Sequence, residues 1–234
     1  MKVLSKLNKL FIRGNVYESP VINRECTEFE VNNWIISKFV IKKLVPIVGI
    51  HPFPISEQVL MVAAVCRTKP THIFEWGTHF GKSARIFFET CKAFNINAQI
   101  HSTDLPVDID HVEHPGERRG LYVKGIKDVN LHYGDGLEKS LFILSQIKRA
   151  NIQPLFFVDG DHSYDSVRRE LEGIIKNVPQ ATVLLHDTFY QSEESRYNTG
   201  PHKAIADVLA SLPNTYKILC QNLGLPGMTL LWHG

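Results

Sequence analysis

The sequence predicts one α/β domain, built on a seven-stranded, mostly parallel sheet with an antiparallel last strand and helices on both faces. Short apolar runs alternate with amphipathic segments from about residue 55 onward. Alternation of helices with short apolar strands buried on both faces is typical of a parallel sheet. The last two runs flank a turn rich in glycine and proline, which predicts a hairpin. We therefore expect a domain over residues 55–234, preceded by a helical N-terminal extension over residues 1–54.

Within the extension, residues 2–13 carry basic and apolar side chains on opposite sides of a helical wheel. Such a helix packs on its own domain or on a sister subunit, which would give a homo-oligomer. The alternative is contact with an anionic membrane surface. Residues 28–45 also have apolar side chains at helical spacing. His51–Pro54 ends this pattern because proline cannot continue a helix.

The elements of the main domain follow in order. A helix over about 56–67 precedes five runs of strand length, at 72–76, 98–102, 129–133, 155–158 and 182–185. Helical spacing of apolar residues separates most of the runs, around Phe87, Leu144 and Leu171. The segments 216–219 and 228–232 flank the turn Gly224–Gly227 and form the predicted hairpin.

The composition excludes several classes of protein. With 26 Lys and Arg against 24 Asp and Glu, the net charge is +2 and does not indicate a nucleic-acid partner. No apolar run is long enough for a transmembrane helix. The four cysteines are widely spaced without a CxxC pair, so we expect free thiols in the reducing cytoplasm rather than disulfides or structural zinc.

The first strand runs into a glycine-containing loop, Glu75–Ser83. Gly77 and Gly81 allow a tight turn and close approach of the backbone to a ligand. The loop is not the dinucleotide motif G-x-G-x-x-G, and it is one residue short of a phosphate loop. Asp104 ends the second run, where an acid accepts hydrogen bonds from ribose hydroxyls. Asp135 lies between two glycines after the third run, so these strand ends fit an adenosine ligand without a pyrophosphate.

The sequence resembles the class I S-adenosylmethionine-dependent methyltransferases. Glu75–Ser83 is similar to the family motif E-x-G-x-x-x-G-x-S, and Asp159–Tyr164 to the DGDHSY signature of a bacterial subgroup of sugar, macrolide and aminocoumarin O-methyltransferases. Leu184–Thr188 resembles the next strand end of that subgroup. The resemblance covers about residues 55–234 and implies a Rossmann-like fold with S-adenosylmethionine as cofactor.

The resemblance also implies roles for individual residues. Glu75, Gly77, Thr78 and Ser83 would surround the methionine part of the cofactor, Asp104 its ribose and Asp135 its adenine. Gly81 and Asp159 complete the expected cofactor-binding set.

The ends of the fourth and fifth runs predict a polar cluster. The resemblance implies metal ligands at Asp159 and Asp187, with His186 where the metal-dependent members have an acid. Oxygen-rich clusters suit Mg²⁺, which can hold two substrate oxygens and acidify the attacking hydroxyl, whereas imidazole prefers softer metals. The alternatives are a divalent-cation site made by Asp159, His186 and Asp187, or a hydrogen-bonded cluster without an ion.

Methyl transfer to a hydroxyl requires a general base. His162 and Asp161 both match positions that serve as bases in different relatives. His162 has the more suitable ordinary pKa, so we expect it to be the base, with Asp161 as second candidate.

Two polar loops, 105–125 and 189–201, follow strand ends where a lid would close over the acceptor. Arg118 and Arg119 in the first loop could clamp an anionic group. Aromatic and charged residues in the second loop suit a polar, ring-shaped acceptor such as a sugar or natural product.

The leading hypothesis is therefore a small-molecule O-methyltransferase. The alternatives are a non-catalytic adenosyl-ligand-binding protein of the same fold and a nicotinamide-dependent oxidoreductase. The oxidoreductase lacks its expected G-x-G-x-x-G motif after the first run.

Overall fold

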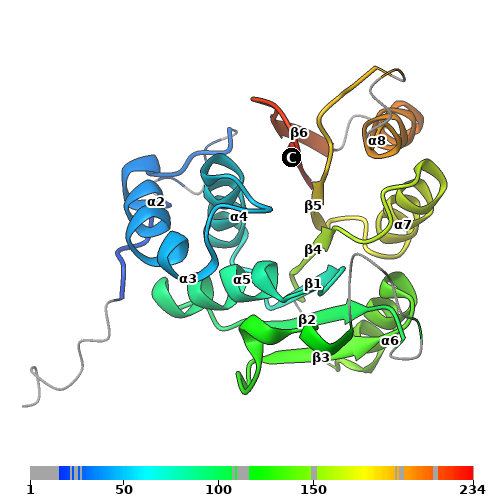
Figure 1. The fold of residues 1–234 in the computed structure, drawn as a ribbon. Coiled ribbons are helices and arrows are strands. Elements are labelled where there is room, and N and C mark those ends of the chain that lie inside the picture. Colours follow the sequence, from blue (N-terminus) through cyan, green and yellow to red (C-terminus); the bar gives the residue numbers. More distant parts are fainter. Residues whose placement is uncertain are drawn as a thin grey trace, which may run out of the picture.

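The computed structural model describes residues 16–21, 23, 26, 28–106, 109, 116–148, 152–192, 194, 198–212 and 216–233. Its centre is one seven-stranded sheet in the order β3-β2-β1-β4-β5-β7-β6 (Figure 1). The strands are β1 (His72–Trp76), β2 (Gln99–Asp104), β3 (Val129–Tyr133), β4 (Pro154–Val158), β5 (Thr182–His186), β6 (Tyr216–Gln221) and β7 (Met228–His233). The predicted fold class is confirmed.

The strand order reverses its direction between β1 and β4. Strands β1 to β5 are mutually parallel, and β7 is antiparallel to both β5 and β6. The chain moves outward from β1 through β2 to β3 and then returns to pair β4 with the other side of β1. Ligands of open α/β sheets bind at such a reversal, beyond the carboxyl ends of the strands.

Helices cover both faces of the sheet (Figure 1). One face carries α3 (Val45–Val48), α4 (Ile55–Thr68) and α5 (Lys82–Ala93), and α2 (Asn33–Phe39) packs against α4. The other face carries α6 (Gly136–Gln146), α7 (Tyr164–Asn177) and α8 (Gly200–Ser211).

Each face has its own apolar core because successive strand residues point to opposite sides. Phe157 of β4 belongs to the core under α4 and α5, where Phe87 of α5 packs on it. Phe156 belongs to the core under α6, α7 and α8. Both phenylalanines are fully buried, so β4 is apolar on both sides, as a central parallel strand must be.

The N-terminal extension is helical in its later part. The predicted helix over 28–45 begins instead at Asn33, because the Asn32 side chain accepts hydrogen bonds from the Trp34 and Ile35 amides and caps the helix there. It continues through a π-turn at Val40–Leu44 into α3, which ends before His51–Pro54 as expected. The basic amphipathic segment 2–13 lies outside the described residues. Within the described part of the chain, no helix has the length and apolarity needed to cross a membrane.

Candidate active site

The loop after β1 is built on a close backbone approach at Gly77. This glycine has φ +90°, and a Cβ there would lie 2.1 Å from the carbonyl oxygen of Asp159, after β4. Gly81 also has a positive φ, +79°, at the start of α5. Only glycine adopts these conformations without strain. Because Gly77 has no Cβ, the first loop can lie directly against the end of β4.

Behind this loop, Glu75 anchors a chain of buried hydroxyls. Ser102 donates to Glu75 Oε1 at 2.6 Å, and Thr78 Oγ1 lies 2.6 Å from the Ser102 hydroxyl. Burial raises the pKa of Glu75 to about 8, against the lowering effect of the neighbouring Ser102 and Ser83 hydroxyls. Glu75 Oε2 is buried without a hydrogen-bond partner among the described residues. An unpaired buried carboxyl oxygen in this place fits a ligand that brings a donor.

Asp104 ends β2 beside the same loop. Its carboxylate accepts hydrogen bonds from the His79 amide at 2.8 Å and the Leu105 amide at 2.7 Å. Arg119 Nε lies 3.3 Å from Asp104 Oδ2, and the Arg119 side chain is 6% exposed. The expected ribose-binding acid is therefore at the expected strand end, and a buried arginine orients it.

Asp135 has a structural task at its strand end. It is the N-cap of α6, since Oδ1 accepts from the Glu138 amide at 2.9 Å. Oδ2 forms an ion pair with Arg169 of α7. The expected contact between Asp135 and an adenine would therefore share this carboxylate with Glu138 and Arg169.

The ends of β4 and β5 bring Asp159, His186 and Asp187 together, as the sequence predicts. His186 Nδ1 lies 2.9 Å from Asp159 Oδ1 and 3.3 Å from Asp187 Oδ2. Asp187 adopts φ +55°, a left-handed conformation that aspartate tolerates better than most residues. One ligand atom from each of the three residues lies within 4.8 Å of the others.

Glu57, in the first turn of α4, belongs to this cluster and was missed by the sequence analysis. Its Oε2 lies 3.0 Å from His186 Nε2, and its Oε1 accepts from the Gly227 amide at 2.8 Å. Glu57 is 2% exposed. The one sequence signal that could have found it is an acid within the helical, largely apolar segment 55–68.

Burial and charge act in opposite directions on the pKa values of the cluster. Burial disfavours protonated His186, but the Asp159 carboxylate and its hydrogen bond outweigh burial and raise the pKa of His186 well above its ordinary value. Burial likewise disfavours ionised Asp159, yet the His186 charge keeps the pKa of Asp159 below its ordinary value. The two residues therefore form an ion pair inside the protein.

The two candidate bases differ in their surroundings. His162 Nε2 lies 3.2 Å from Asp187 Oδ2 and 3.4 Å from Asp159 Oδ1, and its Nδ1 lies 3.3 Å from the Asn198 amide nitrogen. Burial lowers the pKa of His162, but interaction with Asp159 raises it by more. Asp161 is exposed, and both its oxygens accept from Ser163, the N-cap of α7. Asp161 thus shapes the start of the helix.

The residues present do not fit Mg²⁺. This ion requires near-octahedral oxygen and water ligands, but the central donor here is an imidazole. Both nitrogens of that ring already face carboxylates, Asp159 on one side and Glu57 on the other. A cation could bind to Nδ1 of His186 only if this nitrogen gave up its contact with Asp159.

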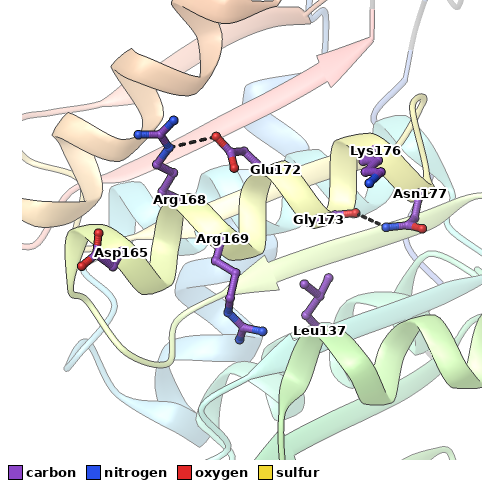
Figure 2. A pocket seen from close by; sticks show the side chains of 8 residues that line it. All are labelled: Leu137, Asp165, Arg168, Arg169, Glu172, Gly173, Lys176 and Asn177. Atoms are coloured by element: carbon purple, nitrogen blue, oxygen red, sulfur yellow. Dashed lines mark hydrogen bonds and ion pairs between the residues drawn. The ribbon is translucent and has the colours of Figure 1, made fainter.

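A groove between α7 and the start of α6 is lined by charged residues (Figure 2). Arg168 and Glu172 pair across one helical turn of α7 at 2.9 Å, and both are about half exposed. None of the sequence-predicted site residues lines this groove. It is a solvated helix face, whereas the polar clusters lie at the carboxyl edge of the sheet.

Comparisons with known proteins agree with this geometry. Residues 74–188 match the family model of a methyltransferase domain. No curated protein matches the sequence.

Solved structures with the same fold include an O-methyltransferase from Bacillus cereus in complex with SAH, at 14% identity and TM-score 0.57, covering 85% of this chain and 90% of that one. TomG from Streptomyces achromogenes, an O-methyltransferase of tomaymycin synthesis in complex with SAM, has 15% identity and TM-score 0.55, with 86% and 88% covered. CalS11, a TDP-rhamnose 3'-O-methyltransferase of calicheamicin biosynthesis, has 16% identity and TM-score 0.52, with 95% and 98% covered.

The matched segment runs from within β1 to just beyond β5 and contains the Gly77 loop, Asp104, and Asp159, His186 and Asp187 of the polar cluster, but not Glu57. Taken with the sheet order, this match shows that residues 74–188 are similar to a methyltransferase domain and that the chain has the fold of the solved O-methyltransferases.

Proposed function

We propose that the chain O-methylates a hydroxyl group of a small molecule, such as a sugar or another natural product. The observation that carries the proposal is the position of His162. His162 lies in the segment that follows β4, and its ring faces Asp159 and Asp187. The Asp159 carbonyl lies against Gly77 of the first loop, Glu75–Ser83, which would bind the cofactor. Methylation of a hydroxyl needs a base near the bound cofactor, because the hydroxyl proton must leave as the methyl group is transferred.

The two carboxylates assign the proton on His162. Both carboxylates lie within 3.4 Å of Nε2 and favour a hydrogen on this nitrogen, although neither has the geometry of a hydrogen bond, and a hydrogen there leaves the lone pair on Nδ1. Nδ1 lies near the Asn198 amide, whose place an acceptor hydroxyl would take. The base would then accept the hydroxyl proton at Nδ1, and the carboxylates would stabilise the imidazolium that forms.

The remaining residues hold the reactants. When bound, S-adenosylmethionine supplies an electrophilic methyl group on a sulfonium. Glu75, Thr78 and Ser83 line the loop that would receive its methionine part, and Asp104 would accept hydrogen bonds from its ribose. The proton goes to the base as the new oxygen–carbon bond forms and the sulfur–carbon bond breaks.

Similar solved structures support the class of acceptor. CalS11 is a TDP-rhamnose 3'-O-methyltransferase, and TomG is an O-methyltransferase involved in tomaymycin synthesis. Tyr190 and His202, whose rings lie 4.7 Å apart beside the loop after β5, add aromatic surface suited to a ring-shaped acceptor.

The test begins with calorimetric titration of S-adenosylhomocysteine, which we expect to bind with one-to-one stoichiometry. A panel of hydroxylated acceptors, including nucleotide sugars and catechols, is then screened for methyl transfer from labelled S-adenosylmethionine.

For the acceptor that is turned over, H162Q should lower kcat by about 10²- to 10⁴-fold while leaving the affinity for S-adenosylhomocysteine unchanged. The matched variant D161N, one residue away, should retain most of the activity. Equal loss in both variants would contradict the assignment of the base, and failure to bind S-adenosylhomocysteine would contradict the proposed function.

A further inference from the structure

His186 is held from two sides at the end of β5. Nδ1 lies 2.9 Å from Asp159 Oδ1 and Nε2 lies 3.0 Å from Glu57 Oε2. An ionised carboxylate only accepts hydrogen bonds, so a ring that faces one on each side donates to both. An imidazole that donates from both nitrogens carries one positive charge and has no lone pair for a metal.

The ring cannot turn away from these partners. His186 is 4% exposed, and its ring centre lies 4.8 Å from that of Phe53 and 6.3 Å from that of Phe157. These aromatic side chains, together with the backbone of β5, fix the plane in which the two nitrogens point. Releasing either nitrogen would leave a buried carboxylate without its partner, which is costly.

Glu57 is fixed independently of the histidine. Its second oxygen accepts from the Gly227 amide at 2.8 Å, in the turn that joins β6 to β7. The carboxylate therefore bridges α4, the closing hairpin and β5. Glu57 contacts the ring nitrogen of His186 that faces away from Asp159, and it therefore orients the ring.

The cluster has the charge arrangement of a cation site. Glu57, Asp159 and Asp187 are three carboxylates in contact with His186, and all three are largely buried. Carboxylates gathered so closely need a positive charge between them. In a metal site the ion supplies that charge. Here the His186 imidazolium, which donates from both ring nitrogens, lies between the carboxylates instead.

We propose that Glu57 and His186 are positioning residues that take the place of a divalent cation, so that the methyl transfer proposed above proceeds without a metal. Glu57 holds the charged ring against Asp159 and Asp187, and these carboxylates in turn orient His162. The inference rests on the proposed O-methylation for its reaction, but its geometry stands on the cluster alone.

The test measures metal binding directly, with Mn²⁺ as the probe. Calorimetry and electron paramagnetic resonance follow Mn²⁺ added to the wild-type chain and to H186D, each with S-adenosylhomocysteine present. The wild type should show no saturable site below about 1 mM, whereas H186D, which gives an all-carboxylate cluster, should bind at least about tenfold more tightly. H233D, which adds one carboxylate at an exposed histidine, is the matched control and should behave as the wild type.

The outcomes separate this inference from the proposed function. Tight Mn²⁺ binding by the wild type, or a folded H186D that binds no better than H233D, would overturn the inference. The wild-type titration decides the matter even if H186D does not fold. For any acceptor that is turned over, methyl transfer should persist in excess EDTA, and its complete loss would also overturn the inference. Absence of S-adenosylhomocysteine binding in the same samples would instead count against the proposed function.

Discussion

Replacing Gly77 with alanine tests whether the first loop owes its shape to the close approach of the Asp159 backbone. At φ +90°, alanine carries a conformational cost of about 1–2 kcal/mol. The added Cβ would also lie 2.1 Å from the Asp159 carbonyl oxygen, well inside van der Waals contact. Overpacking of this kind costs about 1–3 kcal/mol, so the total loss for G77A should be about 2–5 kcal/mol.

Gly125 provides the matched control because its φ is +81° and a Cβ there would meet nothing within 4 Å. G125A should therefore lose only the conformational part, about 1–2 kcal/mol. Urea unfolding followed by circular dichroism gives the free energy of unfolding of both variants. Calorimetry should show weaker binding of S-adenosylhomocysteine for G77A alone, because the displaced backbone carries Asp159. Equal losses of stability in the two variants would refute the reasoning.

Two further predictions concern the cofactor side. Glu75 has a folded pKa of about 8, above its ordinary 4.5, so its contribution to stability is complete below pH 4.5 and is lost as the pH rises through 8. Between pH 5 and pH 8 the free energy of unfolding of E75Q should rise relative to that of the wild type, by at most about 1.4 kcal/mol per pH unit. Urea unfolding at several pH values measures this difference, and a difference that does not change with pH would contradict the prediction. R119M removes the buried partner of Asp104 and should weaken binding of S-adenosylhomocysteine about five- to tenfold in calorimetry. R118M, at the exposed neighbouring residue, should leave the affinity unchanged. Equal affinities of the two variants would show that Arg119 does not orient Asp104.

Much of the fold is local information and could be predicted. Apolar runs of strand length and the turn at Gly224–Gly227 mark β1 to β7, because period and turn chemistry are written in neighbouring residues. The start of the first described helix was misplaced, since the Asn32 cap outweighs the apolar spacing that begins at residue 28.

For the candidate site, the positions of the residues could be predicted from the sequence, but their interaction partners could not. Asp104, Asp159 and His186 lie at the strand ends where the sequence places them, because the carboxyl ends of parallel strands share one edge. What each side chain does there depends on partners distant in the chain. Asp135 lies at the right strand end, yet Arg169 and the start of α6 engage its oxygens.

The sequence by itself thus determined the layers, the strand ends and the types of polar group available at the active edge. Only the tertiary structure decided how those groups pair. Glu57 and His186 are 129 residues apart, and no local pattern indicates that α4 brings a carboxylate to the far side of that ring. Whether a histidine is a metal ligand or a fixed cation depends on which acceptors reach its two nitrogens, and it is the packing of distant elements that brings them there.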